Sequence, residues 1–278
     1  YIHLFESRNK VFDKESVLQE TMIVKFKKNT RFPSCITIST SATNKDFSDL
    51  HKLDVPYQVV VSDNHYYVHL VTDEEEVKSL QSINHFKNTL VDLGLKMKTG
   101  LVVDFRSREL LRDSEDDSTI PLIYSMHIKD GRVRFPQGKE KEYIVKDRKG
   151  LMQENRNYLF VKRFTAKEER RRLQCGIYLK RYLSSFTYIS SQNKVNFIDG
   201  LQGLSECVVY GLYVIFNSTL YDVYYRILNG STQVNSTEIN AMPVPDMSVI
   251  EAMGKQLIAA KNLSVEQCNN ILNHYVNG

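Results

Sequence analysis

The chain has 278 residues, of which 42% are hydrophobic and 25% are charged. These values are typical of a globular protein and allow one large or two smaller domains. The longest apolar run, residues 208–216, falls short of the roughly 20 residues of a membrane helix, which excludes a membrane span. No secretory leader follows Tyr1, so we expect a cytoplasmic protein and, since the first residue is not Met, an excised fragment.

The net charge of +4 is unevenly distributed. Residues 129–181 contain 17 Lys or Arg and 7 Asp or Glu, a local balance of +10, so the remainder sums to −6. A basic stretch of this kind suits a polyanion such as nucleic acid. The alternative is a solvated helix face with ordinary surface lysines.

The four cysteines are too scattered for a disulfide framework or a zinc site, so we expect reduced, mostly buried thiols. They are Cys35, Cys175, Cys207 and Cys268.

The pattern of the first hundred residues predicts strands followed by one helix. Residues 17–26 and 35–39 read as strands, and residues 57–61 and 66–71 as a hairpin closed by a Ser-Asp-Asn turn. Thr72 and Glu75 form a capping-box pattern, and apolar residues then recur at helical spacing. We expect this helix to end at Gly94.

The rest of the chain alternates between strand-like and helical patterns. Strand patterns dominate residues 101–163, which predicts a twisted sheet. A second capping box, Thr165 with Glu168, predicts a helix to about Tyr182, and an apolar stretch predicts another over residues 205–228. Two shorter helices are expected to close the chain, capped by Ser248 and Ser264.

The motifs of methyl transfer are missing. A doubly wound cofactor site needs a glycine-rich strand-to-helix turn, but the first glycine is Gly94. Gly200 and Gly203 have neither the spacing nor a preceding long buried strand, so we interpret them as loop glycines. No two prolines adjoin, although the turn that grips an extruded adenine typically contains a proline pair. We therefore expect no methyl transfer by these residues alone.

Nuclease and metal chemistry also lack a convincing motif. Glu76, Val77 and Lys78 match the residue types of a magnesium-dependent nuclease centre. They lie in the predicted helix, however, and we interpret them as part of its solvent-exposed face. His65 and His69 share one face of a predicted strand, but no third ligand is apparent. We predict no metal site.

Four segments in order resemble the C-terminal recognition region of adenine-specific DNA methyltransferases from restriction–modification systems, including single-chain enzymes that also carry a nuclease. They are NKVFDKESVLQETMIVKF (residues 9–26), MKTGLVVDFRSRE (97–109), YLFVKRFTAKEERRRL (158–173) and residues 211–245, which include LNGSTQVNSTEINAMPVP. The last segment is also similar to type I specificity subunits.

This resemblance implies an α+β fold, with a twisted mixed or antiparallel sheet, flanking helices and a helical C-terminal tail. Residues 1–30 would be the end of, or the linker from, a missing methyltransferase domain, 31–245 the target recognition domain and 246–278 the tail. Double-stranded DNA and a methyltransferase domain in cis are the implied partners. This part would hold no cofactor, whereas the full-length protein would use S-adenosylmethionine, and Mg²⁺ if it also carries a nuclease.

The second segment places basic residues at the start of the predicted sheet. Lys98, Thr99 and Gly100 can expose an ammonium, a hydroxyl and amides to phosphate, or form a plain helix-to-strand connection. Arg106 and Arg108, two apart on a predicted strand, could reach guanine edges, or could pair with the acidic loop that follows them.

The third segment is predicted to contact phosphates. Lys162 and Arg163 end a predicted strand, and Lys167, Arg170 and Arg171 begin a predicted helix. Cationic side chains and helix-start amides together attract phosphate. The intervening glutamates reduce this attraction, because they can cap the helix and pair with the arginines.

The fourth segment carries amide and hydroxyl side chains suited to base or phosphate contact. Thr232, Gln233 and Asn235 are the candidates, although Asn229-Gly230 equally predicts a turn made for the fold. We interpret the tyrosine-rich residues 210–225 as core and domain interface and not as a platform for stacking bases.

The sequence thus predicts a sequence-specific double-stranded DNA recognition domain that positions a target adenine for a catalytic domain outside this chain. One alternative is a fragment of a type I-like specificity subunit or a protein-interaction scaffold. Another is a divergent nuclease or methyltransferase, which the missing glycine turn and proline pair argue against.

Overall fold

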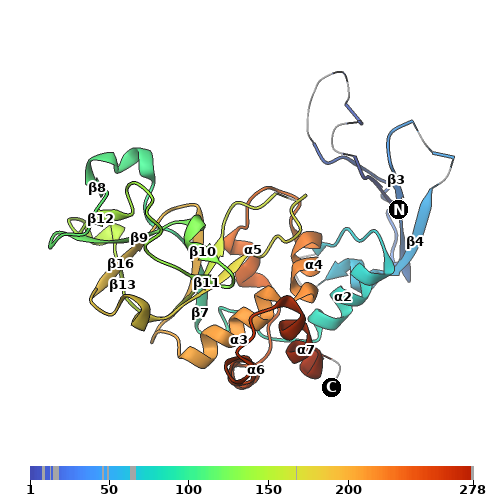
Figure 1. Ribbon diagram of the computed structural model, residues 1–278. Coiled ribbons are helices and arrows are strands. Elements are labelled where there is room, and N and C mark those ends of the chain that lie inside the picture. Colours follow the sequence, from blue (N-terminus) through green and yellow to red (C-terminus); the bar gives the residue numbers. More distant parts are fainter. Residues whose placement is uncertain are drawn as a thin grey trace. The chain divides into compact units, whose positions relative to one another are not determined.

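The computed structural model describes residues 1–7, 10–12, 14, 19–45, 47–48, 50–62, 67–166 and 168–276 (Figure 1). The chain divides into two compact units, Tyr1–Ser82 and Ile83–Gly278. Helices and mixed sheets occur in both, which confirms the predicted α+β class.

The first unit is built on a four-stranded sheet in the order β2-β1-β3-β4. Its strands are β1 (Ile2–Phe5), β2 (Met22–Val24), β3 (Cys35–Ser41) and β4 (His51–Pro56). β1 runs parallel to β3 and antiparallel to β2. The predicted strand at residues 35–39 is confirmed as β3, whereas β2 covers only three residues of the strand predicted at 17–26, whose residues 17 and 18 lie outside the described ones.

The predicted hairpin is present but shorter. β5 (Val61–Ser62) pairs antiparallel with β6 (Tyr67–Val68), while the preceding residues form a helical turn, α1 (Tyr57–Val60). The hairpin turn and His65 lie outside the described residues.

The helix after the hairpin, α2 (Glu74–Asn84), starts and ends at different residues than expected. Asp73 Oδ1 accepts from the Glu76 backbone amide, and a Glu76 carboxylate oxygen accepts from the Thr72 amide, so the capping box is shifted by one residue. The residues between Asn84 and Gly94 form turns, and Gly94 has a φ of +71°. The apolar spacing that continues to Gly94 therefore belongs to packed turns.

The second unit contains two sheets. One has six strands in the order β10-β11-β15-β14-β17-β7. These are β10 (Ile128–Lys129), β11 (Arg132–Val133), β15 (Cys175–Tyr178), β14 (Tyr158–Lys162), β17 (Val195–Gly200) and β7 (Leu95–Thr99). The other has five, in the order β13-β16-β9-β12-β8. These are β13 (Gln153–Glu154), β16 (Tyr188–Ser191), β9 (Thr119–Ile123), β12 (Tyr143–Val145) and β8 (Leu111–Arg112). They confirm the sheet predicted in the middle of the chain.

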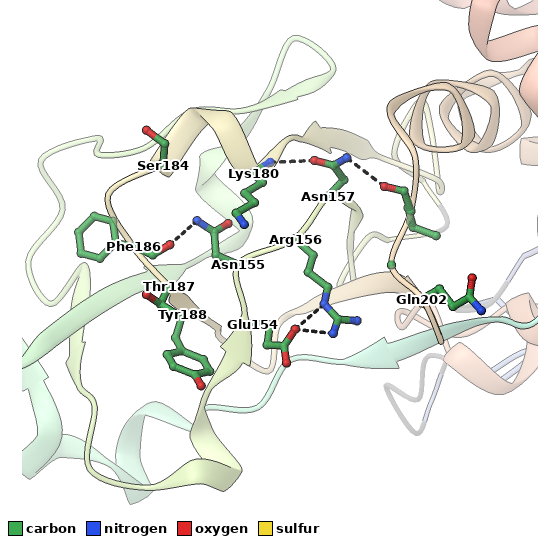
Figure 2. A pocket seen from close by; sticks show the side chains of 12 residues that line it. Glu154, Asn155, Arg156, Asn157, Lys180, Ser184, Phe186, Thr187, Tyr188 and Gln202 are labelled. Carbon is green, nitrogen blue, oxygen red and sulfur yellow. Dashed lines mark hydrogen bonds and ion pairs between the residues drawn. The ribbon is translucent and has the colours of Figure 1, made fainter.

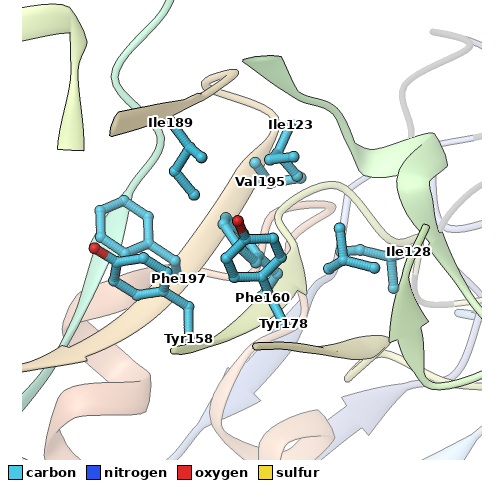
Figure 3. Packing of buried hydrophobic residues seen from close by; sticks show 9 residues of the cluster. Ile123, Ile128, Tyr158, Phe160, Tyr178, Ile189, Val195 and Phe197 are labelled. Atoms are coloured by element: carbon cyan, nitrogen blue, oxygen red, sulfur yellow. The ribbon is translucent and has the colours of Figure 1, made fainter. Parts of the chain in front are cut away.

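One apolar cluster joins the two sheets (Figure 3). Tyr158 and Phe160 of β14 and Phe197 of β17 pack with Ile123 of β9 and Ile189 of β16. Burial of such side chains stabilises a fold by roughly 1.5–3 kcal/mol each. The two sheets therefore share one core, which holds the loops between their strands in place.

Helices pack beside the six-stranded sheet (Figure 1). They are α3 (Glu206–Asn217), α4 (Thr219–Leu228), α5 (Ser236–Ala241), α6 (Met247–Ala260) and α7 (Val265–Val276). The helix predicted over 205–228 is two helices, because the Ser218 hydroxyl accepts from the Tyr221 amide and starts a new one. Ser264 caps α7 as predicted, and Ser205, at the predicted start of its helix, caps α3, but the N-cap of α6 is Asp246 instead of Ser248.

Two glycines allow α3 and α6 to pack closely. A Cβ at Gly211 would lie 1.9 Å from the Ile250 carbonyl oxygen, and one at Gly254 would lie 1.8 Å from that of Cys207. No side chain fits at either position without separating the helices. The glycine that interrupts the apolar run of α3 is thus required by packing.

The helix predicted from Thr165 to Tyr182 is wrong. Residues 165–166 and 168–174 lie outside any helix or strand and are followed by β15 and a short 3₁₀ helix (Lys180–Leu183). The Thr165 hydroxyl donates to the Arg172 carbonyl, and its amide donates to the Thr232 carbonyl, so tertiary contacts replace the predicted cap. Gly200 also departs from expectation, because it is the last residue of the buried strand β17, whereas Gly203 lies after this strand with a φ of +79°.

Two of the four cysteines, Cys175 and Cys268, are buried as predicted, whereas Cys207 is half-buried and Cys35 exposed; all four are unpaired. Over the described residues, no helix is both long enough and apolar enough to span a membrane.

A buried His–Glu pair lies at the edge of the five-stranded sheet. Nδ1 of His127 accepts from the Tyr124 amide at 3.0 Å, so the imidazole proton is on Nε2, which lies 2.7 Å from a Glu142 oxygen. The amides of Gln137 and Gly138 also donate to this carboxylate, at 2.9 and 3.0 Å. Burial lowers the pKa of His127, and the hydrogen bond and charge of Glu142 oppose this only in part.

We expect acid to destabilise the protein through His127. Its pKa is below the ordinary value of 6.5, so the unfolded chain binds a proton first as the pH falls. The contribution of His127 to the free energy of unfolding is fully present above pH 6.5. It is lost as the pH falls toward the pKa of His127 in the folded protein. Urea unfolding between about pH 8 and pH 5 measures it. The variant His127→Gln should show a weaker pH dependence over this range, and equal slopes for the two proteins would contradict the assignment.

Candidate nucleic-acid interface

One turn gathers three segments that are distant in sequence. Residues 192–194 connect β16 to β17, and the Asn193 amide donates to the Val102 carbonyl at 2.8 Å. The Arg163 amide donates to the Lys194 carbonyl at 3.0 Å. Residues 231–234 then pair with Arg163 and Thr165. We call residues 99–102, 163–165, 192–194 and 231–234 the turn face.

The third and fourth sequence segments meet on this face as short paired strands. The Val234 amide donates to the Arg163 carbonyl at 2.7 Å, and Phe164 and Gln233 form an antiparallel bridge. The buried Asn196 side chain donates to the Val234 carbonyl at 2.7 Å. Arg163 is thereby brought beside the Thr232–Gln233 pair, whereas the side chain of Lys162 lines a separate cavity.

Arg163 and Gln233 form the centre of the turn face. The Arg163 guanidinium donates to the Asn193 carbonyl at 3.1 Å and to the Gln233 side-chain oxygen at 3.2 Å. It also lies over the ring of Phe164, 5.6 Å from its centroid. Three contacts therefore fix a half-buried arginine beside a phenylalanine that is 45% exposed. Phe164 and Asn193 were not predicted as site residues: neither carries charge, and Asn193 lies outside the four segments.

Arg172 supports the fourth segment from below. Its guanidinium donates to the Asn229 carbonyl at 2.9 Å and to the Ser231 carbonyl at 2.7 Å, and Nε donates to the Thr165 hydroxyl at 3.3 Å. The side chain is fully buried, and its burial lowers the pKa. The sequence shows three consecutive arginines and does not reveal that the third is internal.

The neighbouring basic residues are not the start of a helix. Arg170 is exposed, whereas Arg171 donates to the Ser218 carbonyl at 3.1 Å. Lys162 is half-buried at the end of β14, and Lys167 lies outside the described residues. Phosphate binding by helix-start amides at this position is therefore wrong, while binding by the side chains stays a prediction.

Arg106 and Arg108 are not on a strand as predicted. They lie in successive 3₁₀ turns, Asp104–Arg106 and Arg108–Leu110, that are anchored by the buried Val102 and Leu110. Both are exposed, and within the described part of the chain neither forms an ion pair with the acidic loop. Arg106 lies over Phe105, which is 65% exposed.

The predicted cluster of Lys98, Thr99 and Gly100 makes contacts that stabilise the fold. Lys98 pairs with Asp199 at 2.9 Å, and the Gly100 amide donates to the Val195 carbonyl at 2.8 Å. A Cβ at Gly100 would lie 2.1 Å from the Gln192 carbonyl oxygen, so close backbone packing requires the glycine. Thr99 is half-buried beside it.

The remaining residues of the fourth segment differ in their environments. Thr232 is exposed on the turn face. Asn235 precedes α5 and donates to Glu238 at 3.2 Å, and its amide donates to the Tyr225 hydroxyl at 3.1 Å. Asn235 is thus held by the fold, as the alternative reading of this segment expected.

A cavity of about 580 Å³ lies at the opposite end of β14 (Figure 2). Its buried amide, Asn155, donates to the Leu183 and Phe186 carbonyls, and its carboxylate, Glu154, is held by Arg156. A S-adenosylmethionine site needs close backbone approach and a carboxylate for the ribose. These residues do not fit that cofactor, and among the described residues no three His, Cys, Asp or Glu side chains gather around a metal site.

Sequence comparison relates the chain to type II methyltransferases of restriction–modification systems. It is 34% identical over 264 residues to type II methyltransferase M.BsuBI of Bacillus subtilis, a match that covers 93% of this chain and 52% of that protein. It is 33% identical over 263 residues to type II methyltransferase M.PstI of Providencia stuartii, covering 92% and 52%. The chain thus spans about half the length of these relatives. No protein-family model matches it.

Among solved structures, the type IIG restriction endonuclease BpuSI aligns with 93% of this chain and 38% of its own. The TM-score is 0.48 at 11% sequence identity.

Proposed function

We propose that the chain recognises a specific double-stranded DNA sequence for a restriction–modification adenine methyltransferase. Methyl transfer would be carried out by a catalytic domain in cis, outside these residues. The relatives support the class of protein, and their greater length leaves room for that domain. In this proposal S-adenosylmethionine, and Mg²⁺ where a nuclease is also present, bind outside the chain described here.

The meeting of Arg163 and Gln233 on the turn face carries the proposal. Arginine and glutamine are the side chains that most often read guanine and adenine edges in the major groove. The Gln233 oxygen accepts from Arg163, so the pair offers its remaining N–H groups as donors. Purine N7 and guanine O6 are acceptors in the major groove, so the chemistry matches.

Exposed cationic side chains of the second unit would fix the position of the DNA. Arg106, Arg108, Arg170 and Lys194 are exposed, and Lys98 keeps about half of its side chain accessible beside Asp199. Contacts to phosphate set orientation without reading sequence. In this proposal Arg163 and Gln233 read the bases, and the exposed cations position the DNA.

Binding to a randomised duplex library over a salt series tests the proposal. We expect enrichment of one sequence, with log affinity falling linearly with log salt by about 0.9 for each neutralised phosphate. A catalytic partner is not needed for this readout, although its absence weakens binding. Affinity that is insensitive to salt and selects no sequence would rule out DNA recognition.

A further inference from the structure

A second cavity has a volume of about 250 Å³. Its lining includes Lys162, the residue before Arg163, but none of the residues of the turn face. It is open on one side and follows the end of β14, where the Lys162 amide donates to the Gln174 carbonyl at 2.9 Å. Its polar lining consists of Asp130, Lys162, Arg171, Gln174, Tyr213 and Asn217.

The positive charges of Lys162 and Arg171, which line this cavity, are poorly balanced by acceptors or carboxylates of the protein. The Lys162 side chain has no hydrogen-bond or ion-pair partner within the described part of the chain. The Nε donor of Arg171 is buried and also lacks a described acceptor. Its nearest carboxylate, Asp222, is 3.9 Å away and is bound by Arg226 at 3.0 Å. Buried donors are normally paired, so this site lacks an acceptor.

The other polar groups of the wall are occupied. Asp130 binds Arg134 at 3.0 Å, and the Gln174 amide donates to Glu169 at 2.6 Å. Tyr213 and Asn217 both donate to one backbone carbonyl, at 3.0 and 3.3 Å. The excess of donors over acceptors around the cavity therefore lies with Lys162 and Arg171.

We propose that this cavity binds one tetrahedral oxyanion, a phosphate group. The Lys162 ammonium and the Arg171 guanidinium both line the cavity, and cationic donors of this kind match the oxygens of a phosphate. The volume is below the roughly 300–1,000 Å³ of pockets for larger organic ligands, so a small ion fits better than a nucleotide. If the proposed function holds, the phosphate belongs to the DNA backbone beside the bases that Arg163 reads. Free phosphate is the other source.

Two measurements on the chain and its Lys162→Met variant test the site. The first follows inorganic phosphate by ³¹P NMR and by thermal unfolding, with chloride holding the ionic strength constant. We expect phosphate to bind the unaltered chain and to raise its Tm, and the variant to lose both effects. The control Lys255→Met removes an equal charge from an exposed position on α6 and should keep them.

The second measurement is the salt dependence of duplex binding. A slope reduced by about 0.9 in Lys162→Met, with the preferred sequence unchanged, supports a DNA phosphate as the ligand. An unchanged slope with lost phosphate binding supports a site for free phosphate. If inorganic phosphate does not bind the unaltered chain, or binds Lys162→Met equally well, the site is overturned. Because the first measurement uses no DNA, failure of DNA recognition leaves its result readable.

Discussion

Replacement of Arg172 by methionine is expected to lower the free energy of unfolding by about 3 kcal/mol. The change leaves the Asn229 and Ser231 carbonyls and the Thr165 hydroxyl without their donor. An unpaired buried polar group costs roughly 1–3 kcal/mol, so three of them outweigh the relief of no longer burying a charge. That relief is real, because burial already lowers the pKa of Arg172, and it keeps the loss below the full sum.

Urea unfolding measures the loss, and hydrogen exchange locates it. The amides of residues 231–234 should exchange faster in Arg172→Met, because the guanidinium no longer links this segment to Thr165. Arg170→Met is the matched control, since Arg170 is exposed and should change stability by no more than about 0.5 kcal/mol. Equal stabilities for the two variants would show that the carbonyl contacts of Arg172 contribute nothing.

The two arginines also show what the sequence could predict and what it could not. Thr165 and Glu168 form a valid capping pattern, and local propensity then favours a helix. The alternative conformation depends on acceptors at Asn229 and Ser231, which are distant in the sequence and invisible to any local pattern. A buried arginine with three fixed acceptors overrides a helix propensity worth a few tenths of a kcal/mol per residue.

Local patterns succeeded where the stabilising contacts were local. Ser205 and Ser264 cap their helices through neighbouring amides, and the strand β3 follows from its β-branched residues. The strand predicted around Arg106 and Arg108 was wrong because the contacts that decide its conformation are not local. The residue types of this segment alternate as in a strand, but the segment forms 3₁₀ turns between the buried Val102 and Leu110.

The candidate site shows the same division. The residue types of the third and fourth segments marked Lys162, Arg163, Thr232 and Gln233 as candidates for DNA contact. The proximity of Arg163 to Thr232 and Gln233 could not be read from the sequence, because a turn at Asn193 and strand pairing across the second unit create it. Residue types therefore marked the candidates, while the topology determines which of them lie side by side.

Arg163→Ala should reduce the preference of the chain for its DNA sequence by roughly 5- to 150-fold, the equivalent of the 1–3 kcal/mol that one bidentate base contact contributes. The reduction should fall on one or two base positions, because Arg163 is fixed by Asn193 and Gln233 and cannot reach elsewhere. Competition binding between the selected duplex and single-base variants measures it. Gln233→Ala removes an acceptor of the guanidinium and should relax the same positions.

Two matched variants separate base reading from charge. Lys194→Ala removes an exposed cation from the same turn and should weaken binding to all sequences equally, with a smaller salt slope. Arg163→Lys keeps the charge but loses the planar fork, so it should retain the salt slope of the unaltered chain and lose most of the preference. If Arg163→Ala instead behaves like Lys194→Ala, Arg163 contacts a phosphate and the turn face orients the DNA without reading it. The position-by-position pattern decides between these roles, because only a base contact makes the loss depend on sequence.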